Sequence, residues 1–112
     1  MLSISHIPIS ILIHSAVLSD ELVDDWGAAV AVNPVDLQRV RFEPYDMFGI
    51  SGQGEHEQLR AVMFYDLQNS LPSGIEFKLK QRVVHDGVIY HIKSIEKLSA
   101  ADGLHHIEVG LI

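Results

Sequence analysis

Seven histidines are the residues of this sequence best suited to metal binding or acid–base chemistry. His105 and His106 are adjacent, and successive side chains of a strand point to opposite faces, so the pair is poorly placed to chelate one ion. His85 and His91 flank an Asp-Gly pair and could face each other across a hairpin, but no third ligand stands at zinc-site spacing. We therefore expect half-buried or surface histidines and no bound metal.

The acidic run Ser19–Trp26 is a second candidate site, because carboxylate oxygens are the ligands that calcium prefers. Its acids are Asp20, Glu21, Asp24 and Asp25. The run lacks the spaced ligands and the central glycine of an EF-hand loop. We interpret it as a solvated surface loop that carries four carboxylates.

The segment Gly49–Gly54 (GISGQG) has the glycine content of a phosphate-binding loop. It lacks the Lys-Ser/Thr ending and a strong following helix, so a flexible loop is favoured. No serine has the context of a nucleophile elbow. No cysteine is present, which excludes disulfides and thiolate nucleophiles. The sequence thus assigns no catalytic residue, no metal ligand and no cofactor.

Strands are the elements that must position these side chains. In Ile75–Leu79 apolar residues alternate with charged ones, which predicts a strand with one buried face. The pair Asp86-Gly87 favours a tight hairpin turn, because it readily adopts positive φ angles. We predict one buried face across this hairpin, made by Phe77, Leu79, Val88, Tyr90 and Ile92.

Further strands are predicted along the rest of the chain, since a two-stranded hairpin alone is marginally stable. They are Ile7–Ile13, with Pro8 at a sheet edge, Asp36–Glu43, which Pro44 ends, Leu59–Tyr65 and His105–Leu111. The 112 residues then form a single domain, residues 1–112. Its predicted class is all-β, a small antiparallel β-barrel or sandwich of about six strands with long loops.

Net charge and apolar content limit the partners. A formal charge of −7 gives no electrostatic reason to bind DNA or anionic membranes non-specifically. Lys78, Lys80 and Arg82, on one face of the predicted strand, are the best candidates for a local basic patch. The first seventeen residues lack a basic region and a long apolar stretch, so we expect neither a signal peptide nor a membrane span.

Five short motifs, in their order and spacing, carry a resemblance to a known family. They are Asp24–Gly27 (DDWG), Arg39–Pro44 (RVRFEP), Met63–Gly74 (MFYDLQNSLPSG), Gly87–Ile92 (GVIYHI) and His105–Val109 (HHIEV). The sequence resembles the minor capsid, or head–tail connector, proteins of long-tailed bacteriophages and prophages, which are head-completion, stopper-like proteins. The resemblance covers about positions 24 to 112.

This resemblance implies a non-enzymatic structural protein, a β-barrel-like adaptor that assembles as an oligomeric ring between the capsid portal and the tail. It implies portal-side and tail-side phage proteins as partners, synthesis in the bacterial host cytoplasm and a place in the neck of the virion. Sequence-specific nucleic acid and membranes are not expected as partners. We expect Ser19–Trp26 and Tyr45–Gln58, the second of which mixes apolar residues with glycines, to become ordered on neighbouring proteins. The interface candidates are Trp26, Tyr45, Met47, Phe48 and Ile50.

Two alternatives stay open. One is a small β-barrel that binds a small molecule, or is an enzyme, through a histidine-containing mouth; it requires a concave pocket with convergent polar groups. The other is a generic barrel interaction module of a bacterial host. An adaptor instead requires exposed contact segments and a barrel filled by side chains.

Overall fold

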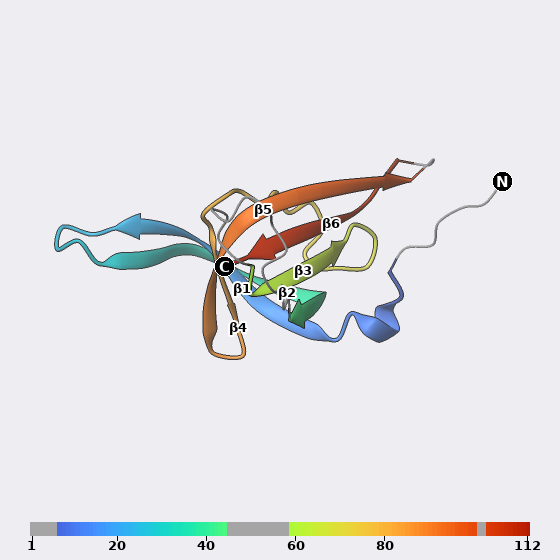
Figure 1. Cartoon of the computed structure of the whole chain (residues 1–112), viewed down its shortest axis with the longest axis horizontal. Helices are drawn as coiled ribbons and strands as arrows, with labels where there is room; N and C mark the ends of the chain where they lie inside the picture. Colours follow the sequence, from blue (N-terminus) through green and yellow to red (C-terminus); the bar gives the residue numbers. More distant parts are fainter. Residues whose placement is uncertain (1–6, 45–58, 101–102) are drawn as a thin grey trace, which may run out of the picture.

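The computed structural model describes residues 7–44, 59–100 and 103–112. These residues form antiparallel strands and one turn of 3-10 helix (Figure 1). The elements are η1 (Ile9–Ile11), β1 (His14–Val23), β2 (Ala29–Pro44), β3 (Ala61–Asp66), β4 (Arg82–His85), β5 (Val88–Ala100) and β6 (Gly103–Leu111). Among the residues described, no helix is long and apolar enough to span a membrane.

The sheet closes into a barrel because β1 pairs on both of its sides. The strand order is β1-β2-β3-β6-β5-β4, every pair is antiparallel, and β4 returns to β1. At the closing seam Leu18 lies opposite Val83. Closure removes the free edges through which open sheets aggregate. The predicted all-β fold of about six strands is thus confirmed.

The barrel interior is filled by side chains that alternate along the strands. Leu37, Val40, Met63, Tyr65, Val83, Val109 and Leu111 are completely buried. Phe77 packs edge-on against Tyr65, with ring centroids 5.3 Å apart. Burial of this apolar surface, at about 25 cal/mol per Å², is the main stabilising contribution to such a fold. The barrel is therefore a packed core.

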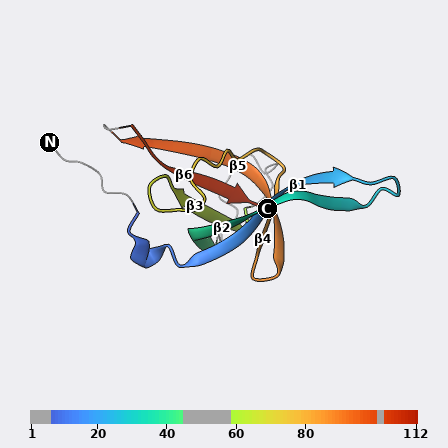
Figure 2. The ribbon, with the colours of Figure 1, turned by 180° about the vertical axis from the view of Figure 1, so that it is seen from behind.

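Strands β1 and β2 continue past the barrel as a two-stranded ribbon, residues 20–32, which we call the arm. The arm leaves the barrel at a β-bulge. Leu18 pairs with Val35 and Asp20 pairs with Val32, so two residues of β2, Asn33 and Pro34, lie opposite the single residue Ser19 of β1. Asn33 takes a φ of 54° there. Bulges bend a strand and increase its twist. Figures 1 and 2 show the arm projecting from the barrel in both views.

The prediction that Ser19–Trp26 forms a surface loop is wrong, because β1 extends through Val23. The ladder continues beyond the barrel, with Leu22 paired to Val30. The backbone groups of this segment that point to β2 are paired with it, and the acidic composition gave no sign of this pairing. Within the predicted loop, only residues 24–26 lie outside β1, and they belong to the turn between β1 and β2.

The predicted strand Ile7–Ile13 is also wrong. Pro8 begins a single 3-10 turn, in which Ile11 N donates to Pro8 O at 3.1 Å. Ile9, Ile11 and Ile13 are exposed, whereas Leu12 is buried. A 3-10 turn repeats every three residues, so the strand period does not select the buried side.

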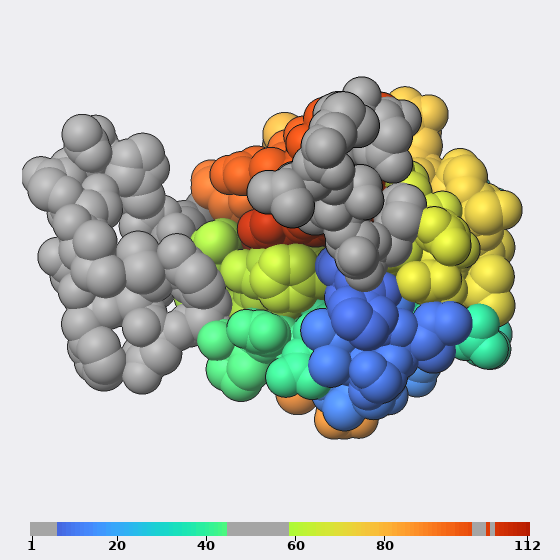
Figure 3. Space-filling model, turned by 90° about the vertical axis from the view of Figure 1, so that its right-hand side faces the viewer, coloured from blue at the N-terminus to red at the C-terminus, as the bar shows by residue number. Residues whose placement is uncertain are grey.

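A buried carboxylate holds this N-terminal segment against the barrel. Asp66, fully buried at the end of β3, accepts from Ile7 N at 3.0 Å. Its other oxygen accepts from Asn69 N at 2.9 Å, and the Asn69 side chain donates to Ile7 O at 3.0 Å. Figure 3 shows the N-terminal segment, in blue, against the yellow-green residues that follow β3.

The hairpin prediction is half correct. Asp86 and Gly87 form the turn between β4 and β5 with φ values of 49° and 76°, as predicted. Ile75–Leu79, however, forms no strand. Gln81 accepts the backbone N–H of Lys78 at 2.7 Å and Lys80 has a φ of 73°, so the chain turns before β4 begins.

The predicted buried face is correspondingly mixed. Phe77 and Ile92 are buried, and Tyr90 is partly buried against the core. Leu79 and Val88 are instead exposed, at 59% and 39%. Since residues 75–79 do not pair with a neighbouring strand, the alternation there carries no information about which side faces the core.

Candidate interaction surface

The arm exposes apolar side chains on both of its faces. Every residue from 22 to 31 is exposed. Leu22 is 60% exposed, Val23 72% and Trp26 93%. An isolated two-stranded ribbon of this kind is marginally stable in water, and clustered exposed apolar residues mark interaction sites. The arm is therefore the candidate functional site.

The tip of the arm is held by one aspartate. Asp24 Oδ1 accepts the backbone N–H groups of Trp26 and Ala28, both at 2.9 Å. Gly27, with a φ of 82°, donates its N–H to Asp24 O at 3.0 Å. These bonds close the turn from within the arm. The Trp26 indole is thus presented to solvent on an ordered turn.

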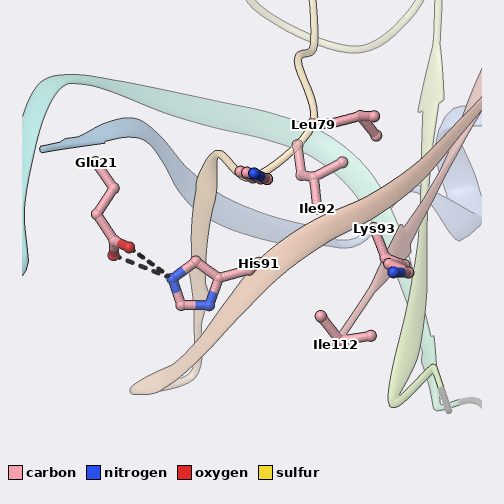
Figure 4. A pocket seen from close by; sticks show the side chains of 7 residues that line it. Glu21, Leu79, His91, Ile92, Lys93 and Ile112 are labelled. Atoms are coloured by element: carbon pink, nitrogen blue, oxygen red, sulfur yellow. Dashed lines mark hydrogen bonds and ion pairs between the residues drawn. The ribbon is translucent and has the colours of Figure 1, made fainter. Parts of the chain in front are cut away.

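The base of the arm is held by an ion pair to the neighbouring strand β4, where Arg82 pairs with Ser19 of β1. Glu21 Oε2 accepts from Arg82 Nη2 at 2.8 Å and from Arg82 Nε at 2.9 Å. His91 Nε2 lies 3.0 Å from the same oxygen (Figure 4). Hydrogen bonding from His91 above all, and then from Arg82, lowers the pKa of the Glu21 carboxyl from its ordinary value.

Asp20 adds a second fastening beside Glu21. Its carboxylate accepts from Gln81 Nε2 at 3.0 Å and from Asn33 Nδ2 at 3.5 Å. The Gln81 bond first, and then the Asn33 bond, lower the pKa of Asp20. Of the four carboxylates predicted to be solvated, Glu21 and Asp20 therefore tie the arm to the barrel.

An open hollow lies where the arm meets the barrel. It has a volume of about 350 Å³. Its apolar lining includes Leu79, Ile92 and Ile112, and its cationic lining includes Lys80 and Lys93 (Figure 4). The predicted basic patch on one strand face does not form, because Lys78 and Lys80 lie outside β4 and Arg82 is paired with Glu21.

The whole of this architecture falls within one protein family. A comparison with families matches residues 8–111 to the family described as minor capsid protein. The chain belongs to the minor capsid protein family of phages. It is therefore a structural, virion-associated phage protein, which interacts with other structural proteins of the particle. A search of curated proteins and a search of solved structures each found no significant match.

The histidines of this family member are spread over several contacts. His85 and His91 do not face each other: His85 pairs with Val88 and stacks on Phe42, with ring centroids 4.0 Å apart. His105 and His106, expected on opposite faces, have their Nδ1 atoms 3.0 Å apart. Within the described ranges no three metal-binding side chains gather in one place.

Of the predicted interface residues, Trp26 is placed at the tip of the arm. Tyr45, Met47, Phe48 and Ile50 lie outside the described residues. The sequence reasoning missed Leu22, Val23 and Val30, which supply the apolar surface of the arm. A signal was present: two apolar runs flank Asp-Asp-Trp-Gly, which is the pattern of a hairpin.

Proposed function

We propose that this minor capsid protein is a head–tail connector, a ring-forming adaptor in the virion neck between portal-side and tail-side proteins. The observation that carries the proposal is the arm, with Trp26 93% exposed on an ordered turn. Tryptophan is among the residues most enriched where binding energy concentrates in protein interfaces. An arm of this kind gains stability when a neighbouring subunit covers it.

The barrel supports the same proposal as a rigid spacer. Its interior is packed with side chains such as Met63 and Tyr65, and the sheet is closed. A closed, filled barrel holds a fixed distance between neighbours, while the arm reaches beyond it. The overall charge of −7 suits a neck through which DNA passes, because like charges repel.

The segment Tyr45–Gln58 is proposed as a second contact. Its sequence combines three glycines with Met47, Phe48 and Ile50, apolar residues that gain from burial on a partner. Deleting Phe48–Gly54 should leave the barrel folded and block the assembly of infectious particles. If the deletion unfolds the barrel, the segment belongs to the core.

The connector role is tested by replacing Trp26→Ala in the phage genome. We expect packaged heads that fail to join tails, counted by electron microscopy, and a fall in infectious titre. The matched control is Ile89→Ala, an exposed apolar residue on the β4–β5 hairpin, which should assemble normally. Normal joining in the Trp26→Ala phage would contradict the proposal.

The filled interior favours the adaptor over a ligand-binding or enzymatic barrel with a histidine-containing mouth. The polar groups that converge at the hollow, Glu21 and His91, hydrogen-bond to each other, and Arg82 completes the cluster. Their hydrogen-bonding capacity thus serves to hold the arm.

A further inference from the structure

We propose that the tip of the arm of one copy seats in the hollow of a second copy, so that Trp26 packs on the apolar lining of its neighbour. The inference rests on the proposed function, since it names the surfaces through which the proposed ring would form. The occupant is a second copy of this chain because the tip carries an exposed aromatic ring and carboxylates, whereas the hollow has apolar walls and exposed lysines.

The tip offers an aromatic ring that follows two acids. Trp26 follows Asp24 and Asp25, and all three are exposed. Glu21 and Asp20 already have partners at the base of the arm, whereas the tip projects into solvent. A ligand of this kind is best received by apolar walls with cations at the rim.

The hollow has this composition. Leu79 is 59% exposed although it is a large apolar residue, and Ile112 also lines the hollow. Lys80 and Lys93 are exposed at the same site. The carboxylate of Glu21, which also lines the hollow, is balanced by Arg82 at 2.8 Å. An arriving Asp25 would therefore meet the ammonium group of Lys80.

The tip cannot reach the hollow of its own chain. Glu21 lines the hollow and is held there by Arg82, and β1 then runs outward through Val23. At about 3.3 Å per residue, the tip lies on the order of 10 Å away from Glu21 along the arm. Two different surfaces then meet at each contact, which is the head-to-tail arrangement that closes into rings or extends into chains.

Trp26 is the sole tryptophan of the chain, so its fluorescence reports the contact directly. We expect the emission of the purified wild-type chain to shift to shorter wavelength as concentration rises, in step with larger species in sedimentation velocity. Lys80→Glu should abolish both changes, and Lys97→Glu, the same charge reversal at another exposed lysine, should preserve them. A wild-type chain that remains monomeric up to about 1 mM would overturn the inference.

Mixing two defective variants tests the head-to-tail geometry. Trp26→Ala keeps an intact hollow and should weaken self-association by about 30-fold or more. Lys80→Glu keeps an intact tip. Their mixture should form a dimer that grows no further, since one functional tip and one functional hollow remain. Failure to form that dimer, with both variants folded by circular dichroism, would overturn the inference.

The phage experiment separates this inference from the connector role. If the mixture forms no dimer while Trp26→Ala phage still fails to join tails, the arm binds another neck protein and only the inference fails. If Trp26→Ala phage joins tails normally, the connector proposal fails, whatever the solution result.

Discussion

Strands β1 and β2 run through both the barrel and the arm, but their apolar side chains are buried in the barrel and exposed in the arm. Within the barrel, β1 and β2 bury Leu18, Leu37 and Val40, and β1 and β2 each have a second neighbouring strand. Beyond the bulge, the ribbon keeps its ladder but loses its neighbours, and Leu22 and Val30 are exposed. Backbone pairing alone therefore does not bury a strand; a closed sheet around it does.

The comparison also separates two kinds of stabilisation. The barrel is held by apolar burial, which is non-directional and collective. The arm is held at a few points by directional bonds: Asp24 at the tip and the Glu21–Arg82 pair at the base. Core substitutions should consequently unfold the protein, whereas arm substitutions should change its contacts.

The largest expected effect contrasts one leucine from each region. Leu37→Ala opens a cavity in the core and should lower the free energy of unfolding by about 2–5 kcal/mol. Leu22→Ala removes an exposed side chain and should change it by less than about 0.5 kcal/mol. Urea denaturation of both variants measures the difference. Equal losses would show that the arm is packed against the barrel.

A smaller loss is expected from Arg82→Ala, which removes the ion pair at the base. Because the two side chains are 19% and 23% exposed, the cost should fall between exposed and buried pairs, at about 1–2 kcal/mol. Lys97→Ala, at an exposed lysine, is the control. A loss no larger than that of the control would mean that the pair does not fasten the arm.

The pH dependence of stability tests whether the ionised Glu21 carboxylate fastens the base of the arm. The pKa of Glu21 is lowered in the folded protein, so its contribution is complete above the ordinary carboxyl pKa, about 4.3. It is lost as pH falls through the folded pKa. Glu21→Gln should flatten the acid limb of the free energy of unfolding against pH. An unchanged acid limb in this variant would contradict the assignment.

The smallest effect on global stability is expected at the tip. Asp24→Ala removes two backbone hydrogen bonds that only the turn uses, so unfolding should change by less than about 0.5 kcal/mol. The amides of Trp26 and Ala28 should nevertheless exchange faster in hydrogen-exchange experiments, while barrel amides keep their protection. Slow exchange at both amides would indicate another restraint on the tip.

Local chemistry explains the parts of the fold that were predicted correctly. Asp86-Gly87 forms the hairpin turn because few other pairs accept positive φ at both positions. The predicted strand Asp36–Glu43 lies within β2, which begins earlier, at Ala29. The interface candidate Trp26 was identified from its residue type; it is exposed, and its role in an interface stays a prediction.

The missed parts depend on partners distant in the sequence. Glu21 meets Arg82 and His91 across 61 and 70 residues, and no local pattern announces such a pairing. The acidic run therefore resembled a solvated loop, although two of its acids fasten a strand. Phe77 is buried against Tyr65 without belonging to any strand, so its burial was predicted correctly for a partly wrong reason.

By itself, the sequence determined that this protein is all-β, where several strands and one hairpin turn lie, and that it resembles phage minor capsid proteins. Alternation and turn residues are local patterns of a few positions, so strands and turns can be recognised from short segments of sequence. Only the tertiary structure decided that the sheet closes through β1 and β4, and that residues 22–31 are left outside it. Closure depends on which strands pair, including strands far apart in the sequence, and the alternation within a single strand does not specify its partners.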